Sequence, residues 1–79
     1  MKVAGADIIA VMREAGINPD VVNKLKFDAP LVDQGLDSMD LPVIAAATEK
    51  KFGLDLSDAD AIKLRTINDF VVYVNQKLA

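Results

Sequence analysis

Few side chains in this 79-residue sequence are suited to covalent or catalytic chemistry. The sequence contains no cysteine and no histidine. It therefore has no thiolate nucleophile, no thiolate or imidazole ligand for a metal, and no Ser–His–Asp triad. Only scattered carboxylates, lysines and hydroxyls remain, in a chain too short to enclose a substrate. We expect no catalytic residue, no metal site and no enzymatic activity.

One hydroxyl stands in a context that could support chemistry, that of Ser38 within residues 35–39 (Gly-Leu-Asp-Ser-Met). Glycine permits a tight turn, and a serine at the mouth of the following helix presents its hydroxyl to solvent. Taken alone, the tripeptide Asp37–Met39 favours a simpler interpretation, in which Ser38 or Asp37 caps the helix. The choice between capping and a reactive role for Ser38 changes only when the spacing of motifs along the whole chain is considered.

Helix start and stop signals organise the first half of the sequence. Residues 6–15 place apolar side chains (Ile8, Ile9, Met12 and Ala15) at helical spacing, and Gly16 is a typical C-terminal stop. A long connection follows, in which Asn18 and Pro19 can begin one short turn through Val22. Its apolar residues are available to pin it to a core: Val21, Val22, Leu25, Phe27, Leu31 and Val32.

The second half contains three further helix signals and no competing strand pattern. A helix is predicted from about Ser38 to Lys51, ended by Gly53. Residues 57–60 and 66–69 each match a capping box, a hydroxyl residue followed three positions later by an acid. The first opens a very short helix and the second a final one. The expected fold class is all-α: a small four-helix bundle with three longer helices, a short third helix and a long loop after the first.

The order and spacing of these elements resemble the acyl carrier protein family over nearly the whole chain. The family signature Gly-x-Asp-Ser-Leu is present as residues 35–39, with Met39 in place of leucine. In the family an amphipathic helix follows and closes on an acid and a phenylalanine, as at residues 49–53. A short acidic helix and a Thr-Ile pair come next, at residues 56–58 and 66–67. The resemblance implies a carrier of acyl groups, held as thioesters on a 4′-phosphopantetheine arm.

Carried over residue by residue, the resemblance makes Ser38 the attachment site of that arm, which is derived from coenzyme A, and Asp37 its neighbour in the motif. The implied partners are a phosphopantetheinyl transferase and the enzymes that load and transfer acyl groups in fatty-acid, lipid or polyketide-type synthesis. The positive end and unpaired N–H groups of the following helix would favour the phosphodiester by about 0.3–1 kcal/mol.

The charge pattern indicates which partners to expect. Twelve acidic and nine basic residues give a net charge of −3, which argues against nucleic-acid binding. Residues 27–48 contain four aspartates and no lysine or arginine, a one-signed stretch that could steer a basic patch on a partner enzyme. The expected docking residues are Asp33, Asp37, Met39, Asp40, Val43, Glu49, Asp58 and Asp60.

The second helix departs from the family pattern in ways that indicate a specialised carrier. Val43 stands where the resemblance leads us to expect a glutamate, and Lys50 and Lys51 stand where acids would be common. Docking would then rely more on apolar contact, or the partners would differ from those of housekeeping fatty-acid synthesis. Pro42 would remove a hydrogen bond inside a helix, so we predict that the helix start beside Ser38 is loosened or displaced.

Small residues on this helix allow two interpretations. In the family, acyl chains can lie between the helices, and small side chains could leave room for them. We interpret Ala45 and Ala46 as helix-forming residues, because alanine has the highest helix propensity, and leave Ala47 open. Met39 could fill a gap in the core.

We expect residues 1–79 to form one free-standing, monomeric domain in the cytoplasm. The longest apolar stretches, residues 41–47 and 70–74, are far shorter than the ~18–20 residues that a bilayer requires, and residues 1–15 lack the core of a signal peptide.

Two alternative functions stay open. One is a peptidyl or aminoacyl carrier of the same broad fold, and the other is a helical adaptor that binds its partner without modification.

Overall fold

The computed structural model describes residues 2–79, apart from the side chain of Asp58, and the regular structure in this range is helical. In chain order the elements are α1 (Gly5–Glu14), α2 (Pro19–Val22), the 3-10 helix η1 (Leu31–Gln34), α3 (Asp40–Phe52), α4 (Asp58–Ala61) and α5 (Ile67–Leu78). The expected small all-α bundle, with a very short helix before the last one, is confirmed. The element that the sequence pattern did not predict is η1.

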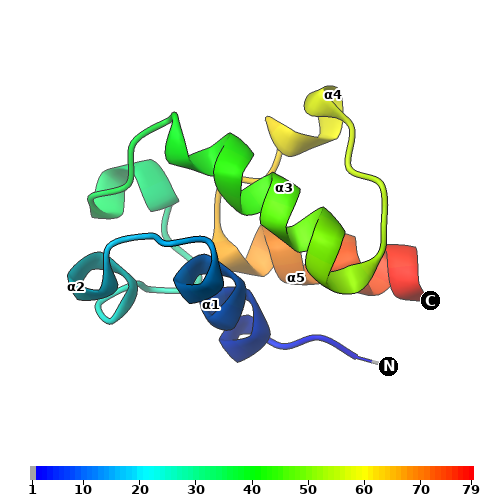
Figure 1. Ribbon diagram of the computed structural model, residues 1–79, viewed down its shortest axis with the longest axis horizontal. Helices are drawn as coiled ribbons and strands as arrows, with labels where there is room; N and C mark the ends of the chain where they lie inside the picture. The colour runs from blue at the N-terminus through cyan, green and yellow to red at the C-terminus, as the bar shows by residue number, and fades with distance from the viewer. Residues whose placement is uncertain (1) are drawn as a thin grey trace.

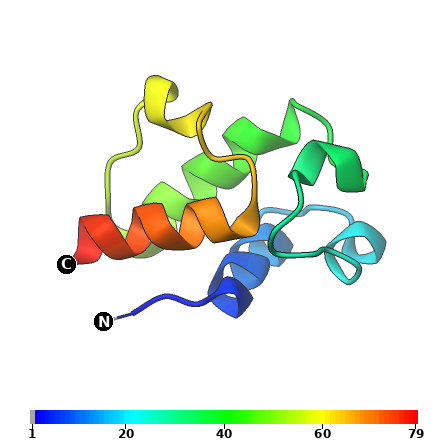
Figure 2. The same cartoon turned by 180° about the vertical axis from the view of Figure 1, so that it is seen from behind.

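The three longer helices pack together, and the short elements lie around them. α1 contacts both α3 and α5, and Figure 1 shows α3 crossing the molecule above α5, with α4 at the upper edge. Seen from behind in Figure 2, α2 and η1 occupy the end of the molecule opposite the C-terminus. Within residues 2–79, no helix has both the length and the apolar character needed to cross a bilayer.

Local capping explains where α1, α4 and α5 begin. The Asp7 carboxylate accepts the Ala4 N–H at 2.8 Å at the start of α1. At the start of α5, Thr66 Oγ1 accepts the Asp69 N–H at 3.0 Å, and Asp69 Oδ2 accepts the Thr66 N–H at 3.1 Å, so the predicted capping box is confirmed. Similarly, Ser57 Oγ accepts an N–H from the first turn of α4.

The buried side of α1 differs in part from the predicted one. Ile8, Val11 and Met12 are buried, whereas Ile9 and Ala15 are only half-buried. Because α1 packs against both α3 and α5, its buried face is centred between them. The largest fully buried side chains of the molecule are Phe70, Ile8, Met12, Leu31, Ile44, Ile67, Val11, Val74 and Thr48.

The long connection between α1 and α3 is held by hydrogen bonds to the segment before α5 and to the start of α5. The Leu31 N–H donates to the Arg65 carbonyl at 2.9 Å, and the Asn68 N–H donates to the Phe27 carbonyl at 3.0 Å. Gln34 folds the connection on itself, since its side chain bonds both backbone groups of Lys26. These contacts place η1 beside the segment that joins α4 to α5.

We predict that Thr66→Ala lowers the free energy of unfolding by about 1 kcal/mol, because the Asp69 N–H loses its acceptor at the start of α5. The matched control is Thr66→Ser, which keeps the hydroxyl and should retain most of the stability. Urea denaturation followed by circular dichroism measures both. Equal stability of the alanine variant and the parent protein would contradict the capping role.

Candidate functional site

Ser38 lies in the short segment between η1 and α3, with its side chain exposed to solvent. Gly35 turns the chain at the end of η1 with a φ of +97°, a left-handed conformation that favours glycine. Leu36 follows and is buried, which fixes the segment to the core. The Ser38 hydroxyl then points outward and donates to Asp37 Oδ1 at 3.3 Å.

Asp37 and Asp40, rather than Ser38, stabilise the start of α3. The Asp37 N–H donates to Asp40 Oδ2 at 2.9 Å, and the Met39 N–H donates to Asp37 Oδ1 at 3.2 Å. The Asp40 N–H donates in turn to the Asp37 carbonyl at 2.9 Å. Ser38 therefore does not cap α3, and its hydroxyl remains exposed to solvent. The N–H groups of Asp37 and Met39 already bond carboxylates, so these two groups are not free for a phosphodiester.

α3 begins at Asp40, two residues after the predicted start at Ser38. Pro42 accounts for the difference, because it has no N–H to donate to the Ser38 carbonyl, one helical turn earlier. Pro42 itself lies in the first turn of α3, where a proline is tolerated. The predicted displacement of the helix start beside Ser38 is thus confirmed.

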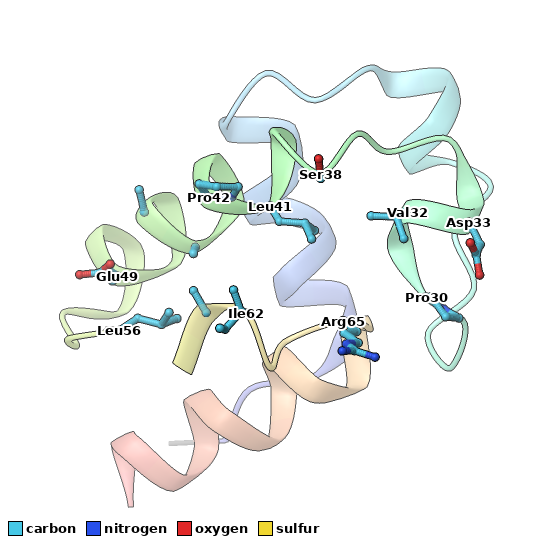
Figure 3. A pocket seen from close by; sticks show the side chains of 13 residues that line it. Pro30, Val32, Asp33, Ser38, Leu41, Pro42, Glu49, Leu56, Ile62 and Arg65 are labelled. Atoms are coloured by element: carbon cyan, nitrogen blue, oxygen red, sulfur yellow. The ribbon is translucent and has the colours of Figure 1, made fainter. Parts of the chain in front are cut away.

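A largely apolar cavity of about 750 Å³ opens beside Ser38. This volume falls within the range of about 300–1,000 Å³ that is typical of small-molecule sites. Figure 3 shows Leu41 and Ile62 on facing sides of the cavity, with Glu49 and Asp33 toward opposite ends. On one side, the lining comes from η1, from the residue before it, from Ser38 and from α3. On the other side, it comes from the segment before α4, from the end of α4 and from the segment between α4 and α5.

Two interpretations of residues on and beside α3 were wrong. Ala45 and Ala46 line the cavity, so their small side chains do more than favour a helix. A side chain of one carbon leaves space between α3 and α4 that a larger residue would fill. Met39 is 75% exposed and does not fill a gap in the core, because the turn before α3 directs it to solvent.

The structure places the predicted docking residues in different surroundings. Ser38, Asp33 and Glu49 line the same cavity, whereas Asp60 accepts a hydrogen bond from Tyr73 on α5. Among the others, Asp37, Met39 and Val43 are exposed, Asp40 is half-buried, and the side chain of Asp58 is outside the described residues.

The cavity lining includes residues that sequence reasoning did not predict for a site: Pro30, Val32, Leu41, Leu56, Ala61, Ile62 and Arg65. Most of them lie in or beside the short elements η1 and α4, which have too little periodicity to show which way a side chain faces. In the part of the chain that the structure describes, no group of three or more carboxylates is arranged to hold a metal ion.

Comparison with known proteins gives a consistent result. A family model described as "Phosphopantetheine attachment site" matches residues 7–74. The chain is similar to an acyl carrier protein of Bdellovibrio bacteriovorus, with 35% identity over 68 residues, covering 85% of this chain and 83% of the relative. It is also similar to acyl carrier proteins of Campylobacter hominis (37% identity, 81% and 78% covered) and Chlamydia trachomatis (31%, 85% and 84%).

We predict that Pro42→Ala extends α3 toward Ser38, because alanine supplies the missing N–H for the Ser38 carbonyl. Backbone carbon chemical shifts of residues 38–40 should move toward helical values, and their amide exchange should slow. Val43→Ala is the matched control, since it raises helix propensity on α3 without adding a donor. Unchanged shifts at residues 38–40 in the Pro42 variant would contradict the explanation.

Proposed function

Because this chain belongs to the acyl carrier protein family, we propose that Ser38 carries its 4′-phosphopantetheine arm. A covalently attached phosphopantetheine is the prosthetic group that the family implies. The observation that carries the assignment to Ser38 is its exposed hydroxyl at the edge of an apolar cavity, inside the motif of residues 35–39 and the matched range 7–74.

The residues around Ser38 fit such a group. The arm supplies a thiol, which the chain itself lacks. In attachment, Ser38 Oγ would attack the pyrophosphate phosphorus that bears the pantetheine, and its proton would pass to a base of the transferase. The P–O bond that joins this phosphorus to the second phosphate would break, and the adenosine bisphosphate half of coenzyme A would leave. The Asp37 carboxylate orients the Ser38 hydroxyl at 3.3 Å, and its second bond, from the Met39 N–H, keeps the turn in place. No residue of the chain acts as a catalyst in this scheme.

The cavity beside Ser38 would shelter an acyl chain. Its lining is mainly apolar, and Ala45, Ala46 and Ala61 leave room between α3 and α4. Each methylene transferred from water into an apolar site is favourable by about 0.8 kcal/mol. A chain of several methylenes would thus remain partly inside the protein, and the thioester would stay near the surface until a partner enzyme takes it up. Fatty-acid, lipid or polyketide-type synthesis would supply such cargo.

Partner enzymes would dock on the surface around the start of α3. Met39 and Val43 are 75% and 46% exposed and form an apolar part of this surface, and Asp33 and Asp37 add negative charge. The aspartates would steer a basic partner toward Ser38, and the apolar side chains would slow its dissociation. An apolar Val43 on α3 fits a specialised carrier with its own set of partners.

We predict that incubation with coenzyme A and a broad-specificity phosphopantetheinyl transferase adds the mass of one phosphopantetheine to the peptide that contains Ser38. Ser38→Ala should gain no mass. Ser57→Ala removes the other serine of the chain and should be modified like the parent protein. An unmodified parent protein, alongside a working control carrier, would overturn the proposal and favour the unmodified adaptor.

We predict that Met39→Ala lowers kcat/KM of the transferase reaction about five- to tenfold, because an exposed apolar contact next to Ser38 is lost. Asp33→Asn should lower it only at low ionic strength, because salt screens the steering by exposed charges. The control is Val72→Ala, which truncates a 55% exposed side chain on α5. If the Met39 and Val72 variants behave alike, the assigned docking surface is wrong.

A further inference from the structure

α4 forms one side of the cavity, although it is too short to hold its own position. Ala61 and Ile62, at its end, and Leu56, just before it, line the cavity. A helix of four residues makes very few internal hydrogen bonds and is not stable alone. Leu56 and Leu64 are buried on either side of α4 and fix the ends of the segment. Between these two residues, other contacts must determine how closely α4 approaches α3.

One side chain of α5 provides such a contact. The Tyr73 hydroxyl lies 3.1 Å from Asp60 Oδ2, within α4, and 3.2 Å from the Asp55 carbonyl, before α4. A single hydroxyl thus ties two points of the segment to α5. Because Leu56 lies between these two points, the contact also restrains a residue that lines the cavity.

The surroundings of Tyr73 favour the protonated phenol, whose single hydrogen is shared between these two acceptors. Burial, the hydrogen bond to Asp60 and the negative charges of Asp60, Glu49 and Asp55 raise the pKa of Tyr73 above its ordinary value of 10.0. The Lys77 ammonium lies 5.5 Å from the centre of the ring and is the cation of α5 nearest to it among the contacts described. The contact to Asp60 therefore persists throughout the neutral pH range.

We propose that Tyr73 is a positioning residue that holds α4 against the bundle as one side of the cavity, and that it thereby sets how long an acyl chain the cavity shelters. The position of α4 does not depend on the proposed function, whereas the role in acyl-chain length rests on it. For the cavity to lengthen or open, α4 must move away from α3. That movement stretches the bonds from Tyr73 to Asp60 and Asp55, so Tyr73 opposes the opening.

The first experiment measures the opening of α4 in the protein without its arm. Tyr73→Phe removes the hydroxyl and keeps the ring. We expect amide hydrogen exchange of residues 57–64 to become about three- to tenfold faster, as the loss of one net hydrogen bond predicts, with the exchange of α1 unchanged. Val72→Thr, on the exposed side of α5, is the control. Unchanged exchange at residues 57–64 would overturn the proposal, whether or not Ser38 accepts an arm.

A conservative variant adds a spectroscopic signature. Asp60→Asn keeps an oxygen acceptor for Tyr73 and removes the negative charge. Exchange at residues 57–64 should remain close to that of the parent protein, while the pKa of Tyr73 falls toward 10.0. Tyr73 is the single tyrosine and the chain has no tryptophan, so tyrosinate absorbance reports on this residue alone. Fast exchange in Asp60→Asn with an unchanged Tyr73 pKa would contradict the contact.

The second experiment tests cargo length in the protein that carries its arm. The arm is loaded with acetyl or octanoyl groups, and thioester cleavage by hydroxylamine is followed by mass. In the parent protein the octanoyl thioester should react more slowly, because the cavity holds part of its chain. In Tyr73→Phe the octanoyl thioester should react at least about threefold faster and the acetyl thioester at the same rate. Equal octanoyl rates in both proteins would overturn the role in chain-length selection.

Discussion

The reciprocal hydrogen bonds of Asp37 and Asp40 are the local constraint on which the site depends. An α-helix must satisfy the N–H groups of its first turn, and the residue at the helix mouth normally does so. Here the Asp40 and Asp37 carboxylates accept the N–H groups of Asp37 and Met39, in the segment just before that first turn, at 2.9 and 3.2 Å, and Ser38 between them stays exposed. Pro42 strengthens the arrangement, because without its N–H the helix cannot extend back through Ser38. The segment is therefore ordered by bonds that leave the Ser38 hydroxyl exposed, with Asp37 Oδ1 as its acceptor at 3.3 Å.

The cavity depends on contacts between segments that are distant in the sequence. η1 is held next to the residues before α5 by the bond from Leu31 to the Arg65 carbonyl, and α4 is held to α5 by Tyr73. α3 forms a further side of the cavity, with alanines at positions 45 and 46. Each of these contacts is modest, and together they leave an apolar space beside an exposed hydroxyl. A carrier needs this combination, since its cargo must be protected in transit and its thioester must be accessible to a partner.

The surface around Ser38 combines charge and apolar contact in proportions that differ from the family pattern. In the proposed docking, exposed aspartates would act over a distance and set how often a partner arrives, while Met39 and Val43 would act only on contact and set how long it stays. Lys51, one of the lysines that stand where acids would be common, pairs with Glu14 of α1 at 3.0 Å. That lysine therefore belongs to the packing of α3 on α1, where an exposed ion pair contributes little to stability.

The sequence by itself determined several helix ends and the motif that contains Ser38. Thr66 with Asp69, Gly16 and Gly53 act on neighbours within a few residues, so their effects are readable without the fold. The same holds for the effect of Pro42. Only the tertiary structure decided that Ala45 and Ala46 line a cavity, that Met39 faces solvent, and that Asp60 bonds Tyr73. These outcomes depend on how segments far apart in the chain meet, because a helix pattern shows which residues share a face and does not show what that face will contact.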